Sequence, residues 1–289
     1  MRTLWPDARS ALSRLLKITA FTSITALTMA SVLDANPAAD YQQPENPPWR
    51  ATVEEERRGR ELLARVIASM GGSRIIDGLD SYSDVHKATV KLPQGDQEVA
   101  GRWMIEFIRS REGARLPDRA REEVTADGPQ GARLTVRVFA PGNSFVVDEG
   151  RVHPLTEERR LEWMMSLQRH PLMLLRASAQ PGFRIAAGGK SHVDGRAVHL
   201  LLIELNGLRL KLGVDAERWR ISTVSYMDKD WQTGVPGQFV VRYSDYRNVA
   251  GLALPFRHEY SCDDRLLLTG IIESITLNQK IDSKLYERP

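Results

Sequence analysis

The sequence predicts a mainly β protein of the α+β type, in which one large antiparallel sheet is accompanied by an N-terminal helix and a central helical segment. Three observations predict this class. The hydrophobic period changes from 3.6 to about 2 after Tyr82 and stays near 2 for most of the remaining chain. Short turn signals separate the apolar runs, and Asn206-Gly207 is the strongest of them. Turns this short join consecutive antiparallel strands, because parallel strands need a long crossover.

Composition agrees with a single packed domain. The chain has 289 residues, of which 42% are hydrophobic and 27% charged, so it can bury a full core. Its formal charge of +3 falls to +1 once residues 1–35, with four cations and two anions, are set aside. No basic footprint for nucleic acid remains, and we expect none among its partners.

Residues 1–35 have the order of a secretory signal peptide. Cations at Arg2, Arg9, Arg14 and Lys17 precede an apolar run of 16 residues, 18–33, and small residues follow. Six Ser or Thr residues make that run polar as well as short for a membrane span, which takes roughly 20 residues. Cleavage is therefore favoured over a retained N-terminal anchor, and both place the protein in the periplasm or cell envelope. The only cysteine, Cys262, is far from this leader, so a lipoprotein-type lipidation site is absent from it.

Two helices are expected after the leader. Residues 36–51, rich in proline, read as an extended linker, and residues 52–289 as one domain. Thr52 can cap a helix that runs to Gly71-Gly72, and a short helix over 74–79 can follow.

Strands occupy most of the rest of the chain. They are predicted at Val85–Leu92, Val99–Arg109, Arg119–Thr125, Arg133–Phe139, Ser144–Asp148, Val198–Leu205, Leu208–Val214, Arg218–Met227, Phe239–Tyr246, Leu252–Ser261 and Leu266–Leu277. A charged tail without a helix is expected after the last strand.

The one helical interruption is Thr156–Ser178. Thr156 is the expected N-cap, and Pro171 should kink or divide the helix near His170. The segment is more apolar than a surface helix requires. We therefore expect it to cover a face of the sheet, since the run 198–205 is apolar on both faces.

The ending YSDYRNVAGLALPFRHEY…IESITLNQKIDSKLYERP, after an N-terminal helix, a long meander and a central apolar helix, resembles a known family. It looks like the outer-membrane lipoprotein-sorting, or LolA-like, periplasmic proteins. The positions that carry the resemblance are Tyr243, Asp245, Tyr246, Gly251, Leu254, Pro255, Asn278 and Pro289. The resemblance implies a strongly curved half-barrel sheet with helices on its concave face, enclosing a cavity for acyl chains or another apolar ligand.

A hydrophobic cavity is the site that these observations favour. Methionines adapt to ligands of irregular shape, and inward aromatic residues could line the same space, although ordinary core packing explains each of them singly. The candidate ligand-binding residues are Trp103, Phe107, Phe145, Leu161, Met164, Met165, Leu172, Leu175, Leu210 and Trp219.

Catalytic and cofactor motifs fail on inspection. Residues 188–191, Gly-Gly-Lys-Ser, lack the opening glycine and the helix of a phosphate-binding loop and predict a turn. The six histidines, His86, His153, His170, His192, His199 and His258, show no metal-protease spacing and read as solvated or packed. Cys262 has no identifiable base nearby in sequence. We expect no cofactor, no metal and no catalytic residue.

The leading hypothesis is an exported, monomeric, non-enzymatic carrier or binding protein for a lipid, an acylated ligand or a lipoprotein. The alternative is an envelope sensor or protein-interaction module that uses the same concave face or a sheet edge. An enzyme with a dispersed site is the third reading, and converging titratable residues would favour it.

Overall fold

A computed structural model describes residues 49–107, 117–128, 131–205 and 207–289 of the chain. The predicted leader, 1–35, and most of the predicted linker, 36–51, lie outside these residues, as does Asn206 of the predicted hairpin turn. Among the described residues, no helix combines the length and apolar character needed to cross a membrane.

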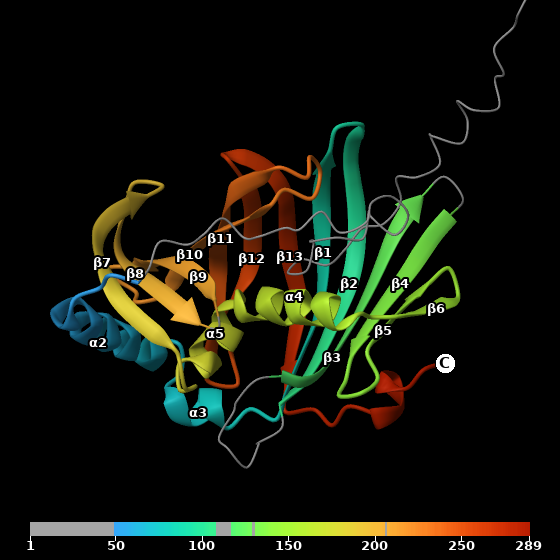
Figure 1. Ribbon diagram of the computed structural model, residues 1–289, viewed down its shortest axis with the longest axis horizontal. Helices are drawn as coiled ribbons and strands as arrows, with labels where there is room; N and C mark the ends of the chain where they lie inside the picture. Colours follow the sequence, from blue (N-terminus) through green and yellow to red (C-terminus); the bar gives the residue numbers. More distant parts are fainter. Residues whose placement is uncertain (1–48, 108–116, 129–130, 206) are drawn as a thin grey trace, which may run out of the picture.

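The fold is built on an open antiparallel sheet of 13 strands (Figure 1). Its strands are β1 (Ser81–Leu92), β2 (Gly95–Phe107), β3 (Pro117–Gly128), β4 (Gly131–Phe139), β5 (Phe145–Asp148), β6 (Arg151–Pro154), β7 (Arg184–Val193), β8 (Arg196–Leu205), β9 (Leu208–Asp215), β10 (Ile221–Lys229), β11 (Pro236–Val249), β12 (Leu252–Cys262) and β13 (Arg265–Leu277). The helices are α2 (Val53–Ser69), α3 (Ser73–Asp77), α4 (Glu157–Gln168), α5 (Pro171–Ala177) and the 3₁₀ helix η1 (Ser283–Tyr286). The predicted fold class is confirmed.

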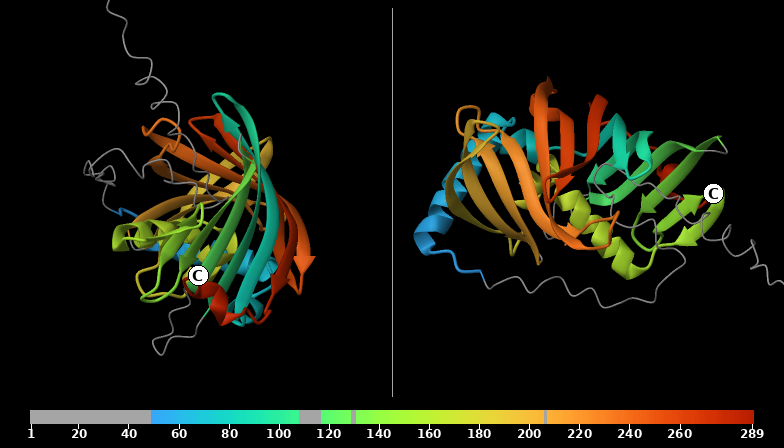
Figure 2. Two further views of the ribbon diagram at one scale, coloured as in Figure 1. Left: turned by 90° about the vertical axis from the view of Figure 1, so that its right-hand side faces the viewer. Right: turned by 90° about the horizontal axis from the view of Figure 1, so that it is seen from above.

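The strand order explains why two helices cross one face of the sheet. The order is β6-β5-β4-β3-β2-β1-β13-β12-β11-β10-β9-β8-β7, so β6 and β7 are its opposite edges although they are consecutive in the chain. The connection between them contains α4 and α5, whose 12 and 7 residues rise about 28 Å together. Twelve interstrand spacings amount to about 58 Å along the sheet. The helices are shorter than the distance along the sheet between its edges, and the strong curvature of the sheet brings these edges closer together. Helices α4 and α5 lie on its concave face (Figure 2).

Helix α2 begins at a complete capping box. The Thr52 Oγ1 accepts from the Glu55 amide, and the Glu55 carboxylate accepts from the Thr52 amide at 2.7 Å. Gly59 then allows α2 to approach β7 closely, because a Cβ there would lie 2.7 Å from the Cα of Ala186. The predicted N-cap and the predicted stop near Gly71-Gly72 are confirmed.

Pro171 divides the central helical segment as predicted. Helix α4 is capped by Thr156, whose Oγ1 accepts from the Arg159 amide at 3.3 Å. After α4, His170 adopts an extended backbone, and Pro171 occupies the first turn of α5, where its missing N–H costs nothing. His170 therefore stands at the junction of the two helices, with its side chain free to point toward the sheet.

One large hydrophobic core joins the concave face to α2, α4 and α5. A smaller cluster lies apart from it, on β4 and β5, and is closed by Tyr286 of η1. The predicted tail without a helix is wrong in this respect: Tyr286 is only 3% exposed, and the carbonyl of Leu285 accepts from Arg121 at 2.7 Å. Asp282 caps this short helix by accepting from the Lys284 amide, and Tyr286 packs onto the smaller cluster.

Two edge strands, β6 and β7, were missing from the predicted set. β6 has only four residues, and β7 contains the Gly188-Gly189 pair predicted to be a turn. That pair instead forms a bulge inside β7, where the register shifts between Ala187 and Lys190 and Gly189 takes φ +92°. The outer face of β8 is also less covered than expected, since Leu202 remains 39% exposed.

The residues that carry the C-terminal resemblance have structural roles. Ala250 and Gly251, both with positive φ, form the two-residue turn between β11 and β12. Tyr246 donates through its hydroxyl to the carbonyl of Ile221 at 2.5 Å. Asn278 follows β13 directly, and its side-chain oxygen accepts from the Asp80 amide at 2.8 Å. The ending therefore specifies turns and strand ends, which supports the fold and leaves the ligand open.

Candidate functional site

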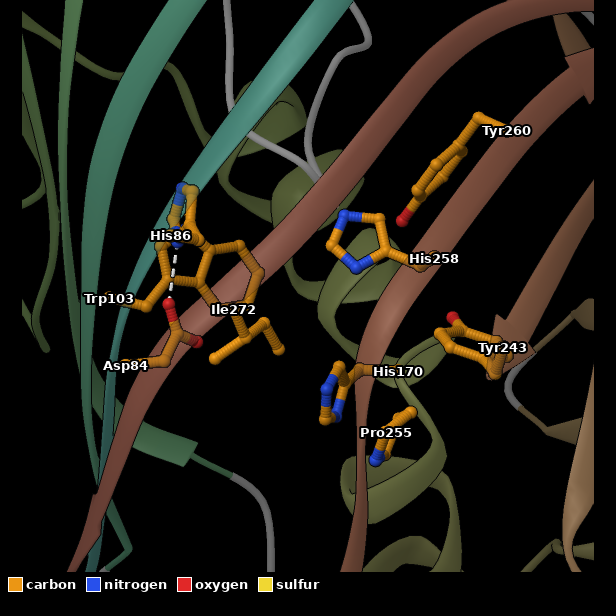
Figure 3. A pocket seen from close by; sticks show the side chains of 9 residues that line it. All are labelled: Asp84, His86, Trp103, His170, Tyr243, Pro255, His258, Tyr260 and Ile272. Carbon is orange, nitrogen blue, oxygen red and sulfur yellow. Dashed lines mark hydrogen bonds and ion pairs between the residues drawn. The ribbon is translucent and has the colours of Figure 1, made fainter. Parts of the chain in front are cut away.

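A polar centre is buried in the middle of the concave face, beneath the junction of α4 and α5 (Figure 3). It consists of Asp84, His86, His170, Tyr243, His258 and Tyr260, called here the buried polar centre. Trp103, Pro255 and Ile272 complete the walls of a cavity of about 20 Å³ among these side chains. Such a space holds about one water molecule or one small polar group and is too small for an acyl chain.

Strand alternation brings these side chains together. Asp84 and His86 occupy inward positions of β1, and His258 and Tyr260 occupy inward positions of β12. β13 alone separates these two strands, so the side chains converge over the centre of the sheet. His170 reaches the same space from the helix junction, where its ring lies 5.8 Å from that of Tyr82.

Two glycines make room for the histidines on the sheet. Gly101 is paired with His86, and a Cβ at Gly101 would lie 2.2 Å from the His86 Nε2. Gly270 is paired with His258, and a Cβ there would lie 2.0 Å from the His258 Nε2. Each imidazole therefore rests over a position that any other residue would fill.

Part of the centre is hydrogen-bonded within the protein. The Asp84 carboxylate contacts the His86 Nδ1 at 2.6 Å, and both side chains are buried. Beside them, the Trp103 indole donates to Glu122, which also pairs with Arg137 at 3.3 Å. Burial raises the pKa of Glu122, and Arg137 opposes that rise.

Two imidazole nitrogens lack a partner. Among the described residues, neither the His258 Nε2 nor the His170 Nδ1 has a hydrogen-bonding group within reach, although both atoms are buried. Such a group costs about 1–3 kcal/mol when it loses water without gaining a partner. Because buried polar atoms in native proteins are normally satisfied, these two indicate a place for a hydrogen-bonding molecule.

Both histidines are neutral at physiological pH. Burial, with neighbouring His86 and His170, lowers the pKa of His258 to about 3. Burial likewise lowers the pKa of His170 to about 4, against the opposing charge of Asp84. A neutral imidazole has one donor and one acceptor nitrogen, so the centre offers both functions without positive charge from these two rings.

The chemistry of a metal site or a reactive thiol is not found in the described part of the chain. No group of three or more His, Cys, Asp or Glu side chains among these residues could hold a metal ion. Cys262 is buried, and burial next to Asp230 and Asp263 raises the pKa of its thiol to about 11, which keeps it protonated.

Two buried arginines attach the helices to their surroundings. Arg169, at the end of α4, donates to Asp228 of β10 at 2.6 Å and lies 4.0 Å from the centre of the Tyr226 ring. Arg176 of α5 donates to the carbonyl of Ile76 and lies over Phe107. Polar side-chain contacts thus fix both helices over the concave face.

The structure brings six of the ten predicted site residues into the core of the concave face. Trp103 lines the cavity itself, while the others pack elsewhere in the same core. These others are Phe107, Met164, Leu172, Leu175 and Leu210.

Of the other four, Trp219 packs against the same core away from the cavity, and three lie outside it. Phe145 belongs to the separate cluster under η1, because its position in β5 directs the side chain to the other face of the sheet. Trp219 packs against this core from the β9–β10 turn, stacked on His199 and near Arg65 of α2, away from the α4–α5 junction. Leu161 is 50% exposed on α4, and Met165 is half-buried.

The histidines were missed as a group, although one signal could have found them. Asp84 and His86 are in phase with the buried positions of their strand, and His258 and Tyr260 are in phase with those of theirs. Polar residues at strand positions that alternate in phase with the buried ones predict a buried polar cluster. Their convergence depends on β1 and β12 lying close together, which strand parity alone does not give.

A second depression, of about 310 Å³, lies over β8, β10, β11 and the β9–β10 turn. Arg196, Arg218 and Arg220 line it together with Asp215 and Asp245. Because side chains of both charges line this depression, it favours no ligand charge, and we take the buried polar centre as the candidate site.

Solved structures share this fold at low sequence identity. A domain assigned to an outer membrane lipoprotein-sorting protein of Vibrio parahaemolyticus matches with a TM-score of 0.52 at 10% identity, over 80% of this chain and 97% of that one. A DUF1329 family protein from Desulfovibrio piger matches with a TM-score of 0.54 at 10% identity, over 81% and 97%. A LolA superfamily protein from Nitrosomonas europaea is 13% identical over 80% and 97%, with a TM-score of 0.47.

No protein-family model and no curated protein matches the sequence. The first two of these matches show the fold of this chain, and the predicted resemblance to the lipoprotein-sorting proteins is confirmed at the level of the fold.

Proposed function

We propose, from the fold shared with the LolA-like proteins, that this protein is a non-enzymatic carrier or binding protein of the cell envelope. Its ligand is a lipid or another molecule with an acyl chain, held between the concave face and helices α4 and α5. The observation that carries the proposal is the extended apolar core at this position, which surrounds a polar centre with two buried imidazole nitrogens that have no partner among the described residues.

Binding requires the two helices to move outward, because the present cavity has only about 20 Å³. Burial gains about 0.8 kcal/mol per methylene, so a C16 chain supplies on the order of 10 kcal/mol before ordering costs. Opening must break the contacts of Arg169 with Asp228 and of Arg176 with Ile76. The apolar gain is large enough to offset the loss of a few such contacts.

The converging titratable side chains do not favour catalysis. A general base works best when its pKa is close to the working pH, and pKa values of about 3 for His258 and about 4 for His170 make both weak bases. The Asp84 carboxylate already contacts His86.

The test is native mass spectrometry of residues 36–289 purified from a periplasm, followed by organic extraction and lipid analysis. We expect a lipid adduct. Met164→Lys, at a half-buried position packed on the core, should lose it, while Leu161→Lys, 50% exposed on the same helix, should retain it. An apo mass together with no displacement of the apolar dye N-phenyl-1-naphthylamine by lipids would contradict the proposal.

The small cavity also favours the second candidate, a protein-interaction module that uses the concave face or a sheet edge. That function predicts a protein partner in crosslinking and an unchanged partner yield in the Met164→Lys protein.

A further inference from the structure

The buried polar centre is a built feature of the sheet. Two of its histidines, His86 and His258, come from β1 and β12, and each rests over a glycine of the neighbouring strand, Gly101 or Gly270. His170 faces them from the opposite side, on the junction of the two covering helices (Figure 3). A molecule between these groups would contact the sheet and both helices at once.

Two side chains that line this space carry a buried nitrogen without a partner among the described residues. The His258 Nε2 belongs to a side chain that is only 5% exposed, and the His170 Nδ1 is buried as well. The cavity between the sheet and the helix junction has room for one hydroxyl-sized group. Apolar core residues continue from it beneath α5, where Leu172 and Leu175 are almost fully buried.

The charges around this space select against an anion. The Asp84 carboxyl group lines it, and Glu122 accepts from the indole of Trp103, which also lines it; their exposures are 5% and 1%. Arg137 is paired with Glu122, and Arg176 is occupied by the Ile76 carbonyl. An anionic head group would therefore enter a buried site next to acidic groups and find no uncompensated cation among the residues that line the cavity.

We propose that the space between His170 and His258 receives the polar end of the ligand, and that this end is an uncharged group that both donates and accepts a hydrogen bond, namely a hydroxyl. The inference rests on the proposed function, and it names the ligand class as a long-chain alcohol or a lipid that presents a free hydroxyl. The hydroxyl donates to one imidazole nitrogen and accepts from another. The chain extends into the apolar core beneath α5.

The experiment uses three probes with the same C12 chain: 1-dodecanol, 1-methoxydodecane, whose oxygen accepts but cannot donate, and dodecyl phosphate, which is anionic. Each displaces N-phenyl-1-naphthylamine from the protein at pH 7.5. We expect the alcohol to bind about tenfold more tightly than the ether, as one buried hydrogen bond predicts, and the phosphate to bind weakest.

Variants of His258 assign the effect to this site. In His258→Phe the advantage of the alcohol over the ether should disappear while the affinity for the ether stays the same. His258→Gln, whose amide also donates and accepts, should restore the advantage. His192→Phe, at an exposed position of β7, is the matched control. Circular dichroism of each variant verifies that it is folded.

Each outcome supports or overturns the assignment of a hydroxyl to this space. Equal affinity for all three probes would overturn the hydroxyl assignment and leave the carrier function standing. Tightest binding of dodecyl phosphate would overturn it in favour of an anionic head group. A preference for the alcohol that survives in His258→Phe would place the head group elsewhere. Failure of all three probes to displace the dye, with an apo mass from the periplasm, would refute both proposals.

Discussion

Acidification should destabilise this protein through His258 well before the carboxylates on its surface become protonated. Burial, together with His86, His170 and Arg257, lowers the pKa of His258 from 6.5 to about 3. Between these two values His258 is protonated in the unfolded chain and neutral in the folded protein. The contribution of the neutral ring to stability is therefore fully present above pH 6.5 and is lost as the pH falls toward 3.

The magnitude follows from these values. At pH 5 the unfolded histidine is 1.5 units below its ordinary pKa of 6.5, and the folded one is still neutral. At 1.36 kcal/mol per unit, His258 alone lowers the free energy of unfolding by about 2 kcal/mol relative to pH 8. The side chain is only 5% exposed, so solvent screening removes little of this effect. Half-buried His170 acts in the same direction, while Glu122, with its raised pKa, opposes it.

The assay is urea unfolding of the wild type and of His258→Phe at pH 8 and pH 5. Taking the difference between the two proteins cancels the other titrating groups. We expect the wild type to lose about 2 kcal/mol more than the variant. His192→Phe, which removes an exposed histidine, should behave as the wild type does. An identical loss in the wild type and in His258→Phe would refute the buried, neutral state of His258.

Three further predictions use the same unfolding assay. Gly270→Ala should cost about 1–3 kcal/mol, since its Cβ would lie 2.0 Å from the His258 Nε2, and a neutral effect would mean that the ring shifts freely. Thr52→Ala should cost about 1 kcal/mol by removing the capping box of α2, and unchanged stability would show that the box contributes nothing there. Phe145→Ala should cost about 3–5 kcal/mol yet leave lipid-probe displacement unaltered, because Phe145 lies in the separate cluster under η1; a change in displacement would connect that cluster to the cavity.

Local chemistry explains which parts of the fold were predictable. The period of 2, the turn at residues 262–265, the Thr52 and Thr156 caps and the division at Pro171 depend on residues close together in the sequence, and the structure has all of them. β6 and β7 were missed because a four-residue edge strand and a glycine bulge carry weak alternation. The position of the tail was not predicted because it depends on the packing of Tyr286 against Val138 and Phe145, which are far away in the chain.

The candidate site divides in the same way. The prediction that apolar residues of the central helix would cover the concave face needed only composition and a resemblance, and it holds for Met164, Leu172 and Leu175. The face of the sheet to which a strand side chain points depends on the exact register. Alternation alone assigned Phe145 to the cavity, whereas its side chain lies in the separate cluster under η1.

The sequence by itself determined the type of fold, the caps and turns that delimit its elements, and the apolar central helix, because period, capping and turn chemistry act over a few residues. Only the tertiary structure decided that Asp84 and His86 meet His258 across β13, and that His170 completes the group from above. The physical reason is the pairing of β1 with β13, which joins strands almost 200 residues apart. That pairing, with the crossover from β6 to β7, converts three scattered histidines into one buried polar centre.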